Sequence, residues 1–337
     1  NNDGDRRKVW PDANQVNFKF SDISLVKQLR NQAIGYFSNL SQAALPFTKS
    51  FGTYSITMVG NPNLGNVKSI MVGVRNRKTE DRLPHCAEIW INELRLTDFN
   101  NQGGWAATGQ VQTKLADVGN LAVSGTYKSP FWGGVESKIN DRTKESTLDW
   151  DMSTALNMGK FLPEALKISL PVYYNYGQTR ITPLFNPLDP DVRMSDLNQI
   201  SDADLQKDIL NRVLDITERK GFNVSNVKIE GLKRKEAKPA FFDLSNFSAT
   251  YVYNEITKHN VTVEQSINRQ LRFNLQYAYA FKNPITLTPL QNSNLFKSKH
   301  WALIKDFNLQ LMPNNIGFST DLNRTYVMLR NRDNTSL

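Results

Sequence analysis

The chain of 337 residues has one cysteine, three histidines and no long apolar run. Its single cysteine, Cys86, cannot form an internal disulfide, so a disulfide framework is excluded. The histidines are scattered and have no acidic partners at metal-ligand spacing. The absence of about 18 consecutive apolar residues excludes a transmembrane helix. A membrane β-barrel is still allowed, because alternation dilutes the apolar residues along each of its strands.

The signals of an enzyme are also missing. Asp149 and Asp151 share one face of an expected strand, where solvated charge is a better interpretation than paired acid–base catalysis. The basic cluster at residues 233–238 lacks the interleaved aromatic residues that nucleic-acid binding requires. The net charge of +9 fits an anionic surface or a basic lumen as well as it fits nucleic acid. We therefore expect no catalytic residue, no metal, no cofactor and no nucleic-acid partner.

The strongest positive signal is the alternation from Leu271 to Phe281. Odd positions are apolar or aromatic and even positions are polar or small, as in a strand with two different faces. Its length of about 11 residues is what a tilted strand needs to cross a bilayer. The same pattern recurs along the chain, with a weaker candidate that breaks phase at 222–232. The other repeats cover 105–115, 121–127, 148–158, 168–176, 247–254 and 307–322.

The composition of the two faces favours a membrane barrel over a soluble sandwich. A sandwich has a charged outer face and an aliphatic inner face, whereas here the apolar face is rich in Tyr, Trp and Phe. The polar face carries Asn, Gln, Ser, Thr and Asp, as in a hydrated interior. The residues that we predict to face lipid are Trp150, Tyr174, Tyr176, Tyr251, Tyr253, Phe273, Tyr277, Tyr279 and Phe281. Those that we predict to face a lumen are Asp149, Asp151, Asn157, Arg272, Asn274 and Gln276.

Two other regions differ from this pattern. Residues 1–100 predict a separate β-sandwich-like domain with a short helix after Asp22 and strands at 53–59, 67–76 and 87–96. Residues 183–221 predict an insertion that begins with a proline-rich loop and contains a helix over 201–220. The apolar stripe of that helix suits packing on its own domain.

The expected turns also suggest which end of each strand is external. Outer-membrane barrels have short periplasmic turns and longer external loops, so the tight turn at Asp117 to Asn120 is placed in the periplasm. Residues 1–100 and the insertion then lie outside the cell. A strand at 222–232 would put the hairpin near His259 outside as well, and 282–306 would be a long periplasmic segment. We favour this arrangement over the one with a periplasmic hairpin.

Several segments of the chain resemble the SprA/Sov family. They include Asn-Pro-Asn-Leu-Gly-Asn-Val at 61–67, Val-Gly-Val-Arg-Asn at 72–76 and Ala-Glu-Ile-Trp-Ile-Asn-Glu-Leu-Arg at 87–95. Gly-Trp-Ala-Ala at 104–107, Asn-Pro-Leu-Asp-Pro-Asp at 186–191 and Asp-Leu-Ser-Asn-Phe at 243–247 continue the match in order. The resemblance implies a piece of a protein-conducting translocon of the type 9 secretion system, with a role in gliding motility. It also implies a single-chain barrel in the cell outer membrane, and cargo proteins, a cargo-shuttling outer-membrane barrel protein and a plug protein as partners.

The sequence therefore predicts an all-β protein. Residues 101–337 would form an arc of about eight strands in a very large transmembrane antiparallel β-barrel in contact with membrane lipid. Residues 1–100 would be an extracellular β-sandwich-like domain, and 183–221 a helix-bearing insertion. Two alternatives stay open: a small porin-like outer-membrane barrel with a surface domain, and a soluble secreted binding protein with two sandwiches. Cargo identity, gating state and partner contact residues are not encoded in any recognisable motif.

Overall fold

A computed structural model describes residue 11 and residues 15–34, 44–75, 86, 88–138, 141–199, 203–229, 240–281, 286–288 and 308–332. Within these residues the chain is predominantly β-structure, and every strand pair is antiparallel. No helix in the described part of the chain is long and apolar enough to cross a membrane.

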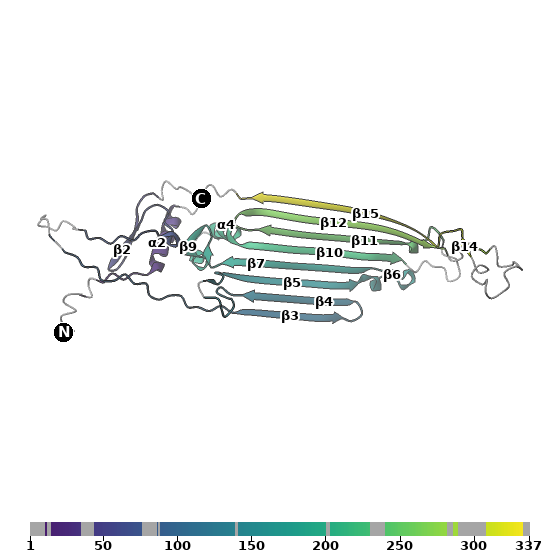
Figure 1. The fold of residues 1–337 in the computed structure, drawn as a ribbon, viewed down its shortest axis with the longest axis horizontal. Helices are drawn as coiled ribbons and strands as arrows, with labels where there is room; N and C mark the ends of the chain where they lie inside the picture. Colours follow the sequence, from purple (N-terminus) through teal and green to yellow (C-terminus); the bar gives the residue numbers. More distant parts are fainter. Residues whose placement is uncertain are drawn as a thin grey trace, which may run out of the picture.

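One large sheet dominates the fold (Figure 1). Eight strands lie side by side in it in the order β3, β4, β5, β7, β10, β11, β12 and β15, and the short β6 pairs with β10. The prediction of about eight strands in the second part of the chain is therefore correct. Their bounds are β3 Ala106–Leu115, β4 Gly119–Lys128, β5 Glu145–Asn157, β6 Ile168–Ser169, β7 Pro171–Pro183, β10 Asp215–Ile229, β11 Phe247–His259, β12 Val263–Ala280 and β15 Asn315–Asn331.

The sheet is open in the described residues. β3 pairs only with β4, and β15 pairs only with β12, so each presents one edge without a strand partner. The outer strands are long, since β12 has 18 residues and β15 has 17. At about 3.3 Å per residue, β12 extends for roughly 60 Å. Its 18 residues are well above the roughly 9–11 residues that a tilted strand needs to cross a bilayer.

The connections divide between the two ends of the sheet. The turn end, where β3 runs into β4, carries the connections 116–118, 158–167, 230–246 and 281–314. The opposite end, called the N-terminal end because residue 106 begins β3 there, carries 129–144, 184–214 and the hairpin 260–262. Residues 222–229 of the strand predicted at 222–232 form part of β10, and 230–232 lie outside the described residues. The hairpin after His259 therefore lies at the same end of the sheet as helix α2 (Phe20–Ile34), and the external location of that end stays a prediction.

The N-terminal unit differs from the expected sandwich domain. Its described residues form helix α2 (Phe20–Ile34), the hairpin of β1 (Phe47–Phe51) and β2 (Tyr54–Met58), and the short helix η2 (Leu64–Asn66). The strand expected at 53–59 is β2, and the helix after Asp22 is α2. The strands expected at 67–76 and 87–96 are wrong: the described residues there pair with no other strand.

The insertion is a small packed module at the N-terminal end. It contains β8 (Phe185–Asn186), β9 (Asp189–Arg193), η6 (Met194–Gln199) and helix α4 (Ala203–Val213). Ile209 and Val213 of α4 are buried against Val192 and Met194, so this helix packs on its own module as predicted. The helix ends at Val213 rather than at Lys220, because 215–220 already belong to β10. The insertion accordingly spans 184–214 rather than 183–221.

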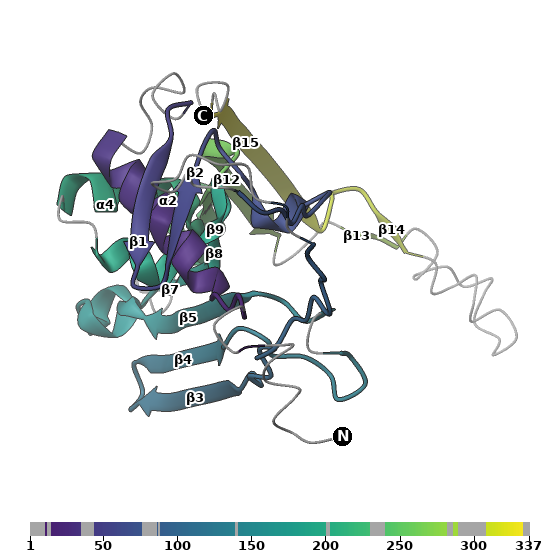
Figure 2. The same cartoon turned by 90° about the vertical axis from the view of Figure 1, so that its left-hand side faces the viewer.

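The N-terminal unit and the insertion lie together at one end of the sheet. Helix α2 contacts β1, β2 and β9. In Figure 2, which looks on this end, α2, β1, β2 and α4 stand in front of the strands. No described helix or second sheet covers either face of the large sheet, and the main buried cluster belongs to the insertion.

Candidate functional site: the two faces of the sheet

Strand pairing divides the side chains of the sheet into two sets. Residues directly opposite each other in antiparallel strands point to the same face. The register Phe273↔Tyr251, Leu271↔Tyr253 and Tyr277↔Phe247 puts these side chains of β11 and β12 on one face. It continues through Tyr253↔Phe222, Phe222↔Tyr174 and Tyr176↔Met152 as far as β5. This side of the sheet is called the apolar face.

All the residues predicted to face lipid lie on the apolar face. Trp150 stands two positions from Met152 on β5, and Phe281 follows Tyr279 in phase just after β12. The rings of Tyr279 and Phe281 are 5.0 Å apart between centroids. The set predicted to face a lumen lies on the opposite side, called the polar face. Contact with lipid or with a lumen stays a prediction for both sets.

No described layer covers the apolar face, which is large. Phe273 is 37% exposed on β12, while Phe318 and Leu322 on β15 are 65% and 60% exposed. A monomeric soluble protein rarely leaves so extended an apolar surface without a partner. This face therefore requires a nonaqueous neighbour or another protein layer.

Aromatic residues on the apolar face form two groups. Toward the N-terminal end, the rings of Trp150 and Tyr176 are 5.2 Å apart, and Tyr253 extends this group onto β11. Toward the turn end, Tyr277 contacts Phe247 at 5.0 Å and Phe241 at 5.6 Å, and its hydroxyl donates to the Phe241 carbonyl at 2.7 Å. Tyr251 lies between the two groups with its ring 6.2 Å from that of Phe222, so aromatic rings extend along much of this face. A face rich in aromatic residues is typical of membrane barrels.

Charged residues begin just beyond the first aromatic group. Glu218, Lys220, Glu255 and Arg269 form a charged row across β10, β11 and β12 on the apolar face. Lys220 Nζ lies 3.4 Å from Glu218 Oε2, and Arg269 is ion-paired with Glu255. The Tyr253 hydroxyl donates to Glu255 Oε2 at 2.8 Å, which ties the row to the aromatic group.

The polar face holds an ion-paired cluster in its middle. Arg219 Nη2 lies 3.1 Å from Asp149 Oδ1 and 3.2 Å from Asp151 Oδ1, and Arg219 Nη1 donates to Thr179 at 2.7 Å. Glycine makes room for this arrangement, since a Cβ on Gly177 would lie 1.8 Å from Asp151 Oδ1. The carboxylates are therefore held by Arg219 and Thr179 of neighbouring strands.

The other polar-face residues are placed along neighbouring strands. Arg272 of β12 pairs with Asp321 of β15 through an Nη2 to Oδ1 distance of 3.1 Å. Asn274 donates to the Thr320 carbonyl at 3.5 Å, and Gln276 stands opposite Ser248 and Ser319. Asn157 closes β5 at the turn end, where its backbone N–H donates to the Val118 carbonyl at 2.7 Å.

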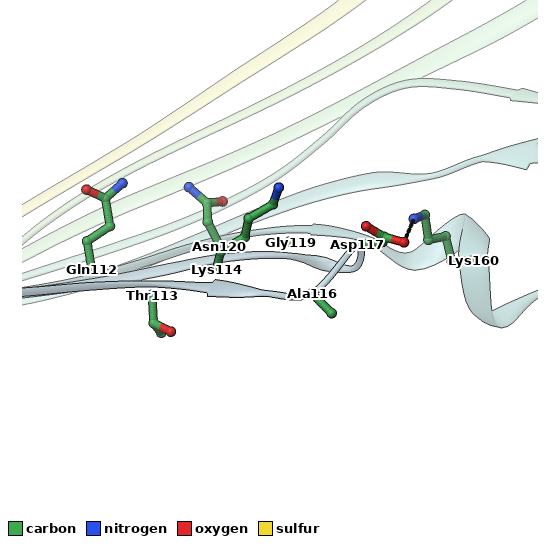
Figure 3. Close-up of a pocket in the computed structure, with 8 residues that line it drawn as sticks. All are labelled: Gln112, Thr113, Lys114, Ala116, Asp117, Gly119, Asn120 and Lys160. Carbon is green, nitrogen blue, oxygen red and sulfur yellow. Dashed lines mark ion pairs between the residues drawn. The ribbon is translucent and has the colours of Figure 1, made fainter.

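Polar side chains of β3 and β4 gather near the turn end of the sheet. In Figure 3, Gln112, Lys114 and Asn120 project to the side where the later strands of the sheet rise, whereas Thr113 projects away. These residues surround an open hollow at the turn end, near an exposed ion pair of 3.8 Å between Asp117 and Lys160. The hollow is open, and its lining is mostly polar.

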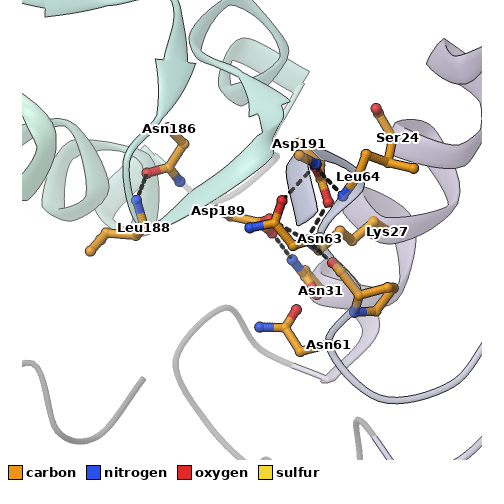
Figure 4. A network of polar contacts seen from close by, with 12 residues as sticks. Ser24, Lys27, Asn31, Asn61, Asn63, Leu64, Asn186, Leu188, Asp189 and Asp191 are labelled. Atoms are coloured by element: carbon orange, nitrogen blue, oxygen red, sulfur yellow. Dashed lines mark hydrogen bonds and ion pairs between the residues drawn. The ribbon is translucent and has the colours of Figure 1, made fainter. Parts of the chain in front are cut away.

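A buried ionic junction joins the N-terminal unit to the insertion (Figure 4). Lys27 Nζ of α2 lies 2.5 Å from Asp189 Oδ1 and 2.8 Å from Asp191 Oδ2, and it donates to the Pro62 carbonyl at 2.6 Å. Asp191 Oδ1 also accepts from the backbone N–H of Leu64 at 2.9 Å. The side chain of Lys27 is only 3% exposed, so the charges are shielded from water.

Sequence reasoning missed this junction. The motifs at 61–67 and 186–191 were recognised separately, and the junction brings them into contact through one lysine of α2. Each motif places an asparagine next to a proline, which suggests a rigid loop, but neither identifies the other as its partner. The advance signal was the presence of two aspartates, Asp189 and Asp191, in a proline-rich loop.

A family model described as motility related/secretion protein, SprA_N, matches residues 1–197. The matched region includes the N-terminal unit, the strands from β3 to β7 and the loop that carries Asp189 and Asp191. No curated protein matches the chain.

Proposed function

The chain belongs to the SprA_N family of motility-related secretion proteins, and on that basis we propose that it forms part of the wall of a protein-conducting channel in the cell outer membrane. The polar face lines the channel and the apolar face contacts lipid. In this role the chain serves type 9 secretion and gliding motility by letting folded cargo proteins pass. The mechanism is passive, and the protein acts as a conduit rather than as an enzyme.

One observation carries this proposal: an eight-stranded antiparallel sheet has an aromatic-rich face that no other described layer covers. A sheet immersed in lipid needs every backbone N–H and C=O group paired, so the wall must continue beyond both open edges. The resemblance to the SprA/Sov family implies that this wall belongs to a very large barrel.

The two alternatives fit this sheet less well. A closed eight-stranded porin-like barrel would pair β3 with β15, yet these strands stand at opposite edges of the described sheet. A soluble protein with two sandwiches would cover the apolar face with a second sheet, and the described residues contain no such layer. If the protein were soluble without such a second sheet, the exposed side chains of Phe318 and Leu322 would face water.

Further parts of the proposal follow from the arrangement of the two ends. The N-terminal unit, the insertion and the hairpin 260–262 share one end, which we assign to the cell exterior, and the turn end is assigned to the periplasm. Cargo proteins pass along the polar face, while a cargo-shuttling outer-membrane barrel protein and a plug protein act as partners. The Arg219 cluster and the Arg272–Asp321 pair neutralise charge within the wall, which keeps the lining hydrated and weakly adhesive toward cargo.

A pair of adjacent positions on β12 tests the wall. Spin labels at Phe273 and Asn274 in the full-length protein, reconstituted in membranes, should report lipid and water, respectively. Equal water accessibility at both positions would refute the two-faced wall. A photoreactive side chain at Asn274 should then capture cargo during export in cells, whereas the same group at Phe273 should not. Cargo capture at both positions, or at neither, contradicts the conduit.

A further inference from the structure

The apolar face changes character along each strand, and the change occurs at a definite residue. On β12 the side chains of this face run from Tyr279 through Phe273 to Leu271, and the next is Arg269. On β11 Tyr253 is followed by Glu255, and on β10 Phe222 is followed by Lys220. The transition therefore forms a continuous boundary rather than an isolated charge.

Across β10, β11 and β12 the boundary follows one hydrogen-bonded row, in which Lys220, Glu255 and Arg269 are in register, and it shifts relative to the rows toward both edges of the sheet. One such row passes in register through Trp150, Gln178, Glu218, Thr257 and Ile267. At its β5 end the row lies inside the apolar stretch of the face, and at its β12 end it lies beyond Arg269. Between β5 and β12 this hydrogen-bonded row therefore crosses the boundary. Such a crossing is expected when the strands are tilted relative to the boundary. Strands of membrane barrels are tilted by about 35–45° relative to the membrane axis, which gives this relation.

The apolar stretch has a similar length on distant strands. On β5 it runs from Leu148 to Leu156, nine residues, and along β12 it runs from Leu271 through Tyr279 to Phe281 just after the strand, eleven residues. Nine to eleven residues extend for about 26–33 Å along a strand before tilt is considered. The lipid-facing band of an outer-membrane barrel is about 25 Å tall. A band of similar length whose limits shift from strand to strand has the geometry of a flat slab crossed by tilted strands.

The side chains at the boundary suit an interface of lipid headgroups. Lys220 Nζ lies 5.9 Å from the ring centroid of Tyr176, and the Arg269 guanidinium lies 5.8 Å from that of Tyr326. Aromatic rings next to charged groups are favoured at the level of headgroups, where one end of a side chain is apolar and the other is wet. Arg180 on β7 and Arg324 on β15 extend the boundary on both sides of the charged row.

We propose that the charged row of Glu218, Lys220, Glu255 and Arg269 lies at the headgroup level of the leaflet on the N-terminal side of the membrane. The strand segments beyond the row form a rim that stands out of the bilayer and carries the N-terminal unit and the insertion. This inference rests on the proposed membrane wall and adds its position relative to the lipid. It predicts that Thr257 and Ile267 meet water although they share a face with Phe273.

The test uses nitroxide labels at single cysteines in the full-length protein, after replacement of Cys86 by serine. The protein is reconstituted into vesicles of phosphatidylethanolamine and phosphatidylglycerol. Oxygen, which concentrates in lipid, and a water-soluble nickel chelate then serve as collision partners. The relaxation of a label at Phe273 should be enhanced mainly by oxygen. At Thr257 the enhancement by the nickel chelate should be several-fold larger than at Phe273.

The possible outcomes separate this inference from the proposed function. If Phe273 contacts lipid and Thr257 contacts lipid equally, the wall stands and the headgroup position of the charged row is wrong. If Phe273 meets water, both the wall and the boundary fail. A label at Leu275, deeper in the apolar stretch, serves as the matched lipid reference. Should Thr257 prove intolerant of the label, His259 on the same face of the rim provides the second position.

Discussion

Lys27 and Asp191 are 164 positions apart in the chain, and their side chains meet with an Nζ to Oδ2 distance of 2.8 Å inside the junction between α2 and β9. The carboxylate of Asp191 is 5% exposed and that of Asp189 is 13% exposed, and Lys27 is ion-paired with both of them. The N-terminal unit is therefore attached to the insertion by a specific buried contact, and not merely by the chain that connects them.

Replacement Lys27→Met should loosen this junction. The variant leaves two shielded carboxylates without their cation, and removal of one partner from a buried ion pair costs about 3–5 kcal/mol. The Leu64 amide, which donates to Asp191, is a direct reporter in a hydrogen-exchange measurement on the full-length protein. Its exchange should accelerate by about 100-fold or more, since each 1.4 kcal/mol corresponds to a factor of ten.

Arg95→Ala provides the control for that measurement. The ion pair of Arg95 with Glu93 is exposed, and such pairs contribute about 0–1 kcal/mol. Exchange of the Leu64 amide should not change in this variant. If Lys27→Met also leaves it unchanged, the junction does not hold the two parts together.

Lysine substitutions at neighbouring positions of β12 should have unequal effects on assembly. Leu275→Lys puts a charge in the middle of the apolar face, which costs about 2–4 kcal/mol at the midplane of a bilayer. Gln276→Lys puts the same charge on the polar face and should cost little. The measurement is the yield of heat-resistant, membrane-inserted protein at equal expression. Equal yields would indicate that the two faces do not meet different solvents.

The Gly177→Ala substitution should displace Asp151 from Arg219. The added Cβ would come within 1.8 Å of Asp151 Oδ1, so the carboxylate has to rotate and lose its contact with the guanidinium. These groups are partly exposed, so the expected loss of stability is at most about 1 kcal/mol. The loss should shrink in an Arg219→Gln background, which a double-mutant cycle on urea unfolding measures. Gly109→Ala, where the new Cβ meets open space, should be nearly neutral in both backgrounds.

The hydrogen bond from Tyr54 to Asp22 should give the N-terminal unit a pH-dependent absorbance. This bond raises the pKa of the Tyr54 hydroxyl above its ordinary value, with burial and the nearby charge as further causes. Because the folded-state pKa is the higher one, the bond is intact below about pH 10 and is lost as the pH rises through the raised pKa. The difference in absorbance at the tyrosinate band between the protein and its Tyr54→Phe variant follows this titration. Asp22→Asn should shift the titration to lower pH, and an unshifted curve would contradict the assignment.

The alternating strands of the sheet were predictable because alternation is a local property. In β12 every second side chain from Leu271 onward lies on one face, as the sequence indicates, and the pairing with β11 and β15 preserves it. The same holds for β5, whose Trp150 and Asp151 point to opposite faces. In such strands, alternate residues of the sequence give the chemical character of each face directly.

The strand β10 shows where a local pattern fails. Its register with β11 shifts between Val224 and Val227, and Asn226 adopts a positive φ of 52°. The extra residue of such a bulge moves the following side chains to the other face, which explains the break in phase. Asparagine tolerates this left-handed conformation better than most residues, so Asn226 was the available signal.

The end of helix α4 could not be read from apolar spacing. Ile209, Val213 and Ile216 fit one helical stripe, yet Ile216 belongs to β10 and pairs with His259 and Arg180. Tertiary pairing with two neighbouring strands decides the structure there, and helix propensity is too weak to oppose it. The same reason applies to the strands expected at 67–76 and 87–96: β-rich composition forms a sheet only where a partner strand is present.

The order of the strands has a practical consequence for mapping the protein in a cell. The sheet contains an even number of full strands, so the chain enters it at Ala106 and leaves it at Asn331 on the same side (Figure 1). Epitopes inserted just before the first strand and just after the last one therefore share a compartment. If the wall spans the membrane, an antibody or protease added to intact cells must reach both epitopes or neither. A single experiment on whole cells thus gives the orientation of the entire sheet.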